Sequence, residues 1–198
     1  MGGMSALDVL LLSNGPAALT DVTAELEAAG HRVVRCHPAT ATAAWPCAAL
    51  VGEPCPLEGG VDVALDVRMA VSSGTSPWED GVACAAREDV PIVLAGRTAM
   101  HPFGSHPTLV VEGRERLADA VERAAELART EREASVQAVC GAPVTLHRDG
   151  SHLHVDVFAT PATPAERGML ATRAAGAARS ITPRATHVTV AVKEPVGA

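Results

Sequence analysis

The residues best suited to chemistry in this chain of 198 residues are its cysteines, of which there are five. Four of them, Cys36, Cys47, Cys55 and Cys84, fall in the first half of the sequence. Four thiolates bind tetrahedral zinc or an iron–sulfur cluster, and the proline after Cys55 is a mild indication of a cluster. No C-x-x-C pair occurs. We predict a zinc or iron–sulfur site at these residues, with buried unreactive thiols and a reversible thiol switch as alternatives.

A second set of ligand-type side chains consists of histidines in the last third of the chain: His147, His152, His154 and His187. Residues 143–147 and 152–157 alternate between polar and apolar types, and Asp149-Gly150 between them is a hairpin signal. Counting outward from that turn pairs His147 with His152 and places His154 on the same face. Imidazoles on one sheet face predict a second metal cluster, with ordinary solvent-facing residues as the alternative.

Nucleophilic catalysis has weaker support in the sequence. There is no nucleophile-elbow motif, P-loop or dinucleotide-binding fingerprint. The enzymatic alternative is a thiol-dependent enzyme or redox protein in which Cys55 or Cys84 reacts and His37, His101 or His106 acts as the base. His101 and His106 lie in a predicted loop rich in Gly and Pro. They either complete the site of the cysteines or are ordinary loop residues. We therefore expect a protein that is not an enzyme.

The elements that position the cysteines alternate between strands and helices. Apolar runs and helical spacing predict a parallel sheet of five strands, with one helix replaced by the loop 37–60 that carries Cys47 and Cys55. The expected strands are 8–13, 31–36, 61–67, 90–95 and 108–112, and the expected helices are 17–29, 76–88 and 114–132. Functional crevices of such sheets lie at the carboxyl ends of the strands, so we expect the four thiols to meet at that rim.

In the remainder of the chain, the pattern of apolar and polar residues changes. A hairpin, an alanine-rich helix over 163–180 and a strand over 187–192 predict a small α+β domain of ββαβ order. The predicted domains are therefore 6–132 and 140–195. Cys140, at the entry to the second domain, is expected to serve packing.

Composition excludes several classes of function. The net charge is −7, with only 16 Lys and Arg residues, so no basic surface for nucleic acid is expected. No apolar stretch approaches the roughly 20 residues that span a bilayer, and the first residues do not resemble a signal peptide. We expect a cytoplasmic protein with no membrane partner, in which the cysteines are reduced.

Two passages, residues 9–34 and 61–69, carry a resemblance to the receiver domains of response regulators. The likeness covers roughly residues 6–130. It implies a flavodoxin-like fold, in which Asp66 stands where receivers carry the phosphorylated aspartate.

The chain departs from the receiver pattern at three of four chemical roles. Ser13 and Asn14 replace the acidic pair that holds the divalent cation, Ala95 replaces the hydroxyl residue, and Val111-Glu112-Gly113 offers no lysine. Asp66 is therefore interpreted as a degenerate phosphoacceptor. Domains with such losses resemble pseudo-receivers, which work by protein contacts or by binding another ligand.

Residues 144–192 weakly resemble the cytoplasmic domain of cation-diffusion-facilitator transporters or the alkaline-shock family. That resemblance implies a dimerising module and hence a homodimer. Together these features predict a cytoplasmic regulatory or sensor protein, a pseudo-receiver with a cysteine-based metal or redox site. A thiol-dependent enzyme and a metal-free interaction scaffold are the alternatives.

Overall fold

The computed structural model describes residues 6–14, 19–37, 47–69, 74–97, 102–103, 107–111, 116–182 and 185–195. The chain divides into two compact units, Met1–Glu126 and Leu127–Ala198. The division falls within one helix, α3 (Leu117–Cys140). Each unit is described by itself below.

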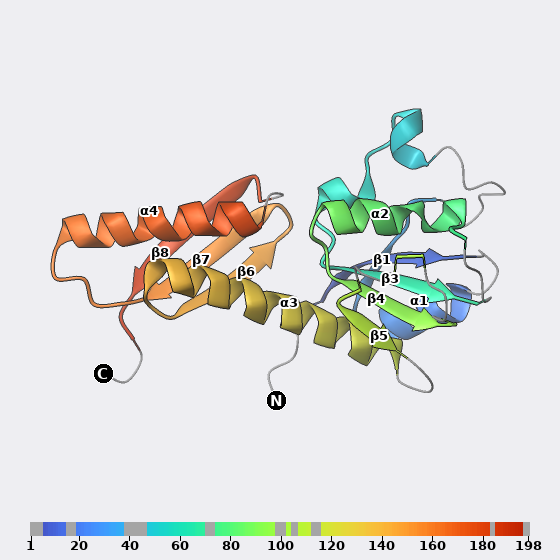
Figure 1. The fold of residues 1–198 in the computed structure, drawn as a ribbon, viewed down its shortest axis with the longest axis horizontal. Helices are drawn as coiled ribbons and strands as arrows, with labels where there is room; N and C mark the ends of the chain where they lie inside the picture. The colour runs from blue at the N-terminus through green and yellow to red at the C-terminus, as the bar shows by residue number, and fades with distance from the viewer. Residues whose placement is uncertain are drawn as a thin grey trace. The chain divides into compact units, whose positions relative to one another are not determined.

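The first unit is built on a sheet of five parallel strands in the order β2-β1-β3-β4-β5 (Figure 1). Strands β1, β3 and β4 are buried on both faces almost throughout, which explains their continuous apolar sequences. The predicted α/β class with a five-stranded parallel sheet is confirmed. The strands are β1 (Asp8–Ser13), β2 (Arg32–Val34), β3 (Val63–Arg68), β4 (Ile92–Gly96) and β5 (Leu109–Val111).

Helices cover both faces of this sheet (Figure 1). Helix α1 (Leu19–Ala28) and the first turns of α3 pack on the face formed by Val9, Leu11 and their neighbours. Helix α2 (Asp80–Arg87) packs on the opposite face of the sheet. We call the apolar side chains between α2 and this face the α2 layer. The sheet contributes Leu10, Leu12, Ala64, Ile92 and Leu94 to it. The sheet therefore separates two apolar layers, and residues of alternate parity on each strand enter different layers.

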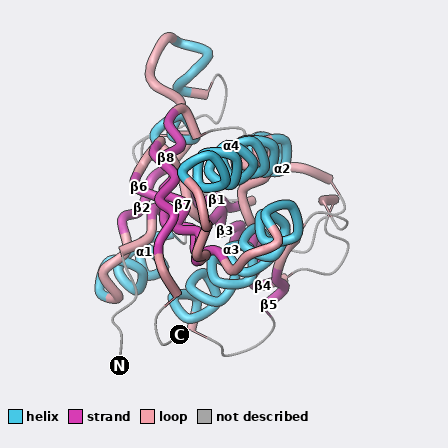
Figure 2. The backbone as a smooth tube through the Cα atoms, turned by 90° about the vertical axis from the view of Figure 1, so that its left-hand side faces the viewer, coloured by secondary structure: helices cyan, strands magenta, loops and turns pink. Residues whose placement is uncertain are grey.

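Between β2 and β3 the described residues form two short 3-10 helices instead of an α-helix. These are η2 (Ala48–Val51) and η3 (Pro56–Gly59). Leu57 of η3 is buried in the α2 layer, whereas Leu50 and Val51 of η2 are mostly exposed. η2 stands away from the sheet in both views of the chain (Figures 1 and 2). Residues 38–46 of the predicted loop lie outside the described residues, and these short helices are what the structure shows of the rest.

The approach to α2 is fixed by a capping box. The Ser76 hydroxyl accepts a hydrogen bond from the Trp78 backbone N–H at 3.3 Å, and the Glu79 carboxylate accepts one from the Ser76 N–H at 2.8 Å. Pro77 occupies the first position of a single 3-10 turn, η4 (Pro77–Glu79), which leads into α2. The start predicted from the sequence is therefore confirmed.

The second unit contains the end of α3, a three-stranded sheet and helix α4 (Pro164–Ile181). The sheet has the order β6-β7-β8, with β6 (Val144–Asp149) antiparallel and β8 (His187–Lys193) parallel to β7 (His152–Phe158). The predicted ββαβ order is confirmed.

Both helices of the second unit contribute to its core on one face of that sheet. Helix α3 continues to Cys140, beyond the predicted end at 132, because Val136 and Cys140 extend its apolar stripe into this core. Cys140 is buried there, as expected for a packing residue. Alternate residues of β6 and β7 point away from the helices and are exposed.

Within the parts of the chain that are described, none of the helices combines the length and the apolar character needed to cross a membrane.

Candidate functional site

Three of the four predicted ligand cysteines converge on one apolar layer. The side chains of Cys36, Cys55 and Cys84 are half-buried and pack against the α2 layer. They come from the residue pair after β2, the turn that opens η3, and helix α2. The Cys36 sulfur lies beside Gly81, where an added Cβ would be only 3.0 Å from it. The fold therefore brings together thiols that are far apart in sequence.

Cys47 belongs to the same neighbourhood, since its thiolate contributes to the electrostatics of two of the others. We call Cys36, Cys47, Cys55 and Cys84 the cysteine group. Burial raises the pKa of the Cys36 thiol to about 12, and the other three thiolates of the group add to this. Burial also raises the pKa of the Cys84 thiol, Arg87 opposes that shift, and two thiolates of the group add to it. Charge on neighbouring thiols therefore disfavours charge on Cys36 and on Cys84.

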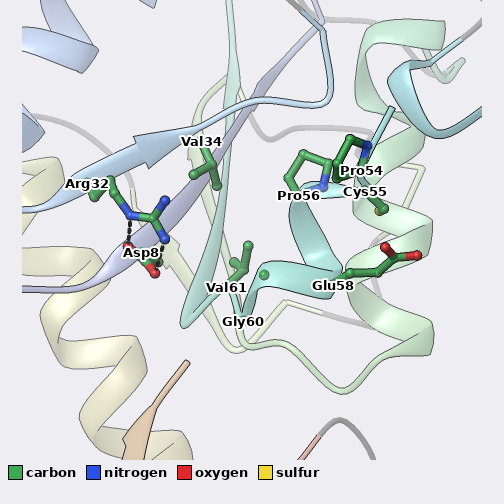
Figure 3. A pocket seen from close by; sticks show the side chains of 10 residues that line it. Asp8, Arg32, Val34, Pro54, Cys55, Pro56, Glu58, Gly60 and Val61 are labelled. Atoms are coloured by element: carbon green, nitrogen blue, oxygen red, sulfur yellow. Dashed lines mark hydrogen bonds and ion pairs between the residues drawn. The ribbon is translucent and has the colours of Figure 1, made fainter. Parts of the chain in front are cut away.

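The cysteine group lies beside the edge strand β2 and differs in this respect from the prediction. Cys55 lines a hollow of about 390 Å³ together with Asp8 and Arg32, the first residues of β1 and β2 (Figure 3). The Arg32 guanidinium forms an ion pair with the Asp8 carboxylate at the other side of that hollow. The predicted meeting point at the carboxyl ends of the strands is therefore wrong for Cys55. The reason is that residues 54–61 lie beside the starts of β1 and β2, and the Asp62 N–H donates a hydrogen bond to the Asp8 carbonyl just before the chain enters β3.

His37 follows Cys36 and lies against the start of α2. Its ring makes an edge-to-face contact with the Trp78 indole, with centroids 5.1 Å apart. Burial lowers the pKa of His37, partly offset by the charge of Asp80. The lowered pKa favours the neutral imidazole, which is the form that ligates metals or accepts protons.

Within the described ranges, no group of three or more His, Cys, Asp or Glu side chains is arranged to hold a metal ion as it stands. The cysteine group is thus a gathering of neighbouring thiols, whose sulfur atoms would have to converge to share one ion. The five cysteines are all free.

A buried charged cluster lies in the α2 layer, and the sequence did not predict it. The side chains of Asp66, Arg68 and Glu79 are fully buried. Arg68 Nε is 2.8 Å from Glu79 Oε1, and the Asp66 carboxyl is hydrogen-bonded to Glu79. Burial raises the pKa of Asp66 to about 6, against the lowering effects of Arg68 and Glu79. The alternation of side chains along β3 could have predicted this cluster. Asp66 and Arg68 point to the same face of the sheet as Ala64, which belongs to the α2 layer.

The receiver-like positions are occupied by this cluster and by a structural amide. Asp66 has no exposed surface from which a phosphoryl donor could be reached. The Asn14 side-chain carbonyl accepts a hydrogen bond from the Met69 N–H at 2.9 Å, so it ties the end of β1 to the end of β3. Ser13 and Ala95 are buried. Asn14 therefore joins two strand ends at a position where the resemblance implied an acidic residue.

The predicted histidines share the open face of the second unit's sheet, but their pairing differs from the prediction. Gly150 and Ser151 form the two-residue turn, so Asp149 is opposite His152 and His147 is opposite His154. The prediction placed the turn one residue too early. His152 and His187 are neighbours on the parallel strands β7 and β8, with ring centroids 4.6 Å apart.

The rim histidines His101 and His106 lie outside the described residues.

Comparison of the chain with protein-family models, with curated proteins and with solved structures found no match.

Proposed function

We propose that the protein is a non-enzymatic regulatory or sensor protein whose cysteine group binds a metal, either zinc or an iron–sulfur cluster. The observation that carries this proposal is the convergence of Cys36, Cys55 and Cys84 on one apolar layer beside Cys47. The donor set is that of a four-thiolate centre.

The electrostatics of the group support a bound cation. Neighbouring thiolates add to the raised pKa values of Cys36 and Cys84, which favours the protonated form of these two thiols in the metal-free protein. A divalent ion or a cluster reverses this relation, because its positive charge stabilises each thiolate that ligates it. Cys47 and Cys55 flank the short helix η2 in a segment that lacks long helices or strands, and such a segment can adjust to draw sulfur atoms together.

The same electrostatics weigh against a thiol-dependent enzyme. Reactive cysteines have a lowered pKa, produced by a cation or a helix N-terminus. The thiols of Cys36 and Cys84 show raised pKa values instead. A nucleophilic role for Cys84 is therefore disfavoured, and a metal-free scaffold remains the alternative in which the thiols are simply buried.

For the first unit we propose the flavodoxin-like class and a pseudo-receiver role. The parallel strand order β2-β1-β3-β4-β5 is the one found in flavodoxin-like domains. The buried cluster around Asp66 supports a role without phosphorylation.

For the second unit we propose self-association into a homodimer. Light scattering of the purified protein would test this, and a homodimer would give twice the chain mass of 20.3 kDa.

The deciding experiment is anaerobic purification followed by metal analysis and an absorption spectrum. One zinc per chain with a colourless protein, or iron and sulfide with visible absorption, would support the proposal. The Cys→Ser variants at positions 36, 47, 55 and 84 should each lose most of the metal. The C140A variant is the matched control, because Cys140 belongs to the core of the second unit and should keep the full metal content.

A protein without zinc or iron whose thiols are all slow to label would contradict the metal proposal and favour the scaffold. A metal-free protein with one thiol that labels quickly near neutral pH would favour the thiol-dependent enzyme instead. Equal metal loss in C140A and in the other variants would show that the loss reflects unfolding.

A further inference from the structure

The open face of the second unit's sheet carries four histidines in an unbroken row. Ring centroids are 6.3 Å apart for His147 and His154, 6.5 Å for His154 and His152, and 4.6 Å for His152 and His187. All four residues are exposed, whereas the alternate residues Leu146, Leu153 and Val155 are buried beneath them. The row therefore crosses all three strands on the side away from the helices.

The tightest part of this row combines nitrogen and oxygen donors. His152 lies directly opposite Asp149 on β6 and directly beside His187 on β8. Residues at such positions project from the same face of a sheet, so a carboxylate and two imidazoles occupy one rung across the three strands. His154 follows on the next position of that face of β7. Two imidazoles and a carboxylate suit zinc, nickel and copper ions rather than magnesium or calcium.

We infer that this face binds a divalent transition-metal ion through His152 and His187, with Asp149 or His154 as the third protein ligand. The two rings lie almost parallel, with 16° between their planes, so their nitrogens do not yet point at a common centre. Exposed side chains change rotamer within nanoseconds, and small rotations of both rings can aim one nitrogen of each at an ion between the strands. The paired backbones fix the spacing of the two rings, so only the side chains have to rotate.

The site shares no ligand with the cysteine group, because its ligands belong to the second unit and are nitrogen and oxygen atoms. Asp156, at the far end of the same face of β7, is paired with Lys193 and is therefore not counted as a ligand. Open coordination positions would be filled by water. Such a site exchanges its ion readily, in contrast to a closed structural centre.

The test uses the full-length protein and Ni²⁺ as the probe, followed by calorimetry at about pH 7.5. We expect about one equivalent of Ni²⁺ to bind to the wild type, and affinity to fall at least about tenfold in H152N/H187N. The T189N variant is the matched control, because Thr189 lies beside His154 on the same face and should bind as the wild type does. Lowering the pH to about 5.5 should weaken binding, since only neutral imidazole is a ligand.

Two further measurements separate this site from the cysteine group. Paramagnetic Ni²⁺ should broaden the ring resonances that disappear in H152N/H187N, and it should leave the labelling rate of the thiols unchanged. Unchanged affinity in H152N/H187N, or thiols that Ni²⁺ protects while the histidine resonances stay sharp, would overturn the inference. Because the replaced side chains are exposed, circular dichroism should show the variants folded.

Discussion

The carboxyl groups of Asp66 on β3 and Glu79 at the start of α2 are joined by a hydrogen bond, and both side chains are fully buried. Arg68 forms an ion pair with Glu79 beside this contact. Two ionised carboxyl groups so close together would repel each other strongly in an apolar layer. The pair therefore tends to retain one proton, as closely spaced carboxyl groups do.

This proton gives folding stability a defined pH dependence. Burial raises the pKa of Asp66 from its ordinary value of 3.8 to about 6, so the folded state binds more protons than the unfolded state between these values. The contribution of Asp66 to the free energy of unfolding should therefore fall, by at most about 3 kcal/mol, as the pH rises through that window. Urea unfolding at about pH 4.5 and about pH 7.5 measures the change. The D66N variant should lose this part of the dependence, and an identical pH profile in D66N would contradict it.

The ion pair between Arg68 and Glu79 should be important for stability. Replacing one partner leaves the other charge buried, and such changes cost about 3–5 kcal/mol. We expect R68M to unfold at a correspondingly lower denaturant concentration, and R68M/E79Q to recover part of the loss. The control is R116A, whose exposed ion pair with Asp119 should contribute less than about 1 kcal/mol. Similar losses in R68M and R116A would argue against the buried pair.

Gly81 on α2 should control the packing of the cysteine group. A Cβ there would be 2.7 Å from a methyl carbon of Leu12 and 3.0 Å from the Cys36 sulfur, so G81A must displace one of them. We expect a stability loss of about 1–3 kcal/mol, typical of overpacking, together with reduced metal content. G168A is the control, because its helical position on α4 has no neighbour within 4 Å. That variant should be as stable as the wild type or up to about 1 kcal/mol more stable.

Metal-free Cys36 should be a slow nucleophile. Because its pKa is raised to about 12, only a small fraction is thiolate near neutral pH. In a variant that keeps Cys36 as its single cysteine, the alkylation rate should increase about tenfold per pH unit up to about pH 9 without reaching a plateau. The other thiolates are absent in that variant, so this measures the effect of burial, the larger cause. The urea-unfolded chain is the reference, and a plateau near pH 8 in the folded protein would contradict the expectation.

Local signals explain why much of the fold was predictable. The apolar runs of β1, β3 and β4 and the capping boxes of Ser76–Glu79 and Thr163–Glu166 specify their elements without distant contacts. Strand β2 is shorter than predicted, and it is an edge strand paired only with β1. The end of α3 was placed too early, because its last turns are stabilised by packing in the second unit.

The candidate sites depend on tertiary features that a sequence pattern does not contain. The cysteines were identified by residue type, but the path of residues 54–61 beside the starts of β1 and β2 decides where Cys55 lies. The hairpin register depended on whether Asp149 or Ser151 completes the turn with Gly150, and a change of one residue alters each cross-strand pair. The Asp66–Glu79 contact joins residues from two elements, and no local sequence pattern pairs them.

The buried cluster also constrains how this sequence can diverge. A substitution at position 66, 68 or 79 changes the charge that the other two residues must balance inside the protein, so an isolated replacement at one of them is selected against. The three positions should therefore be inherited together or be replaced together by apolar residues in distant homologues. Exposed pairs such as Arg116 and Asp119 carry no such linkage and are free to drift separately.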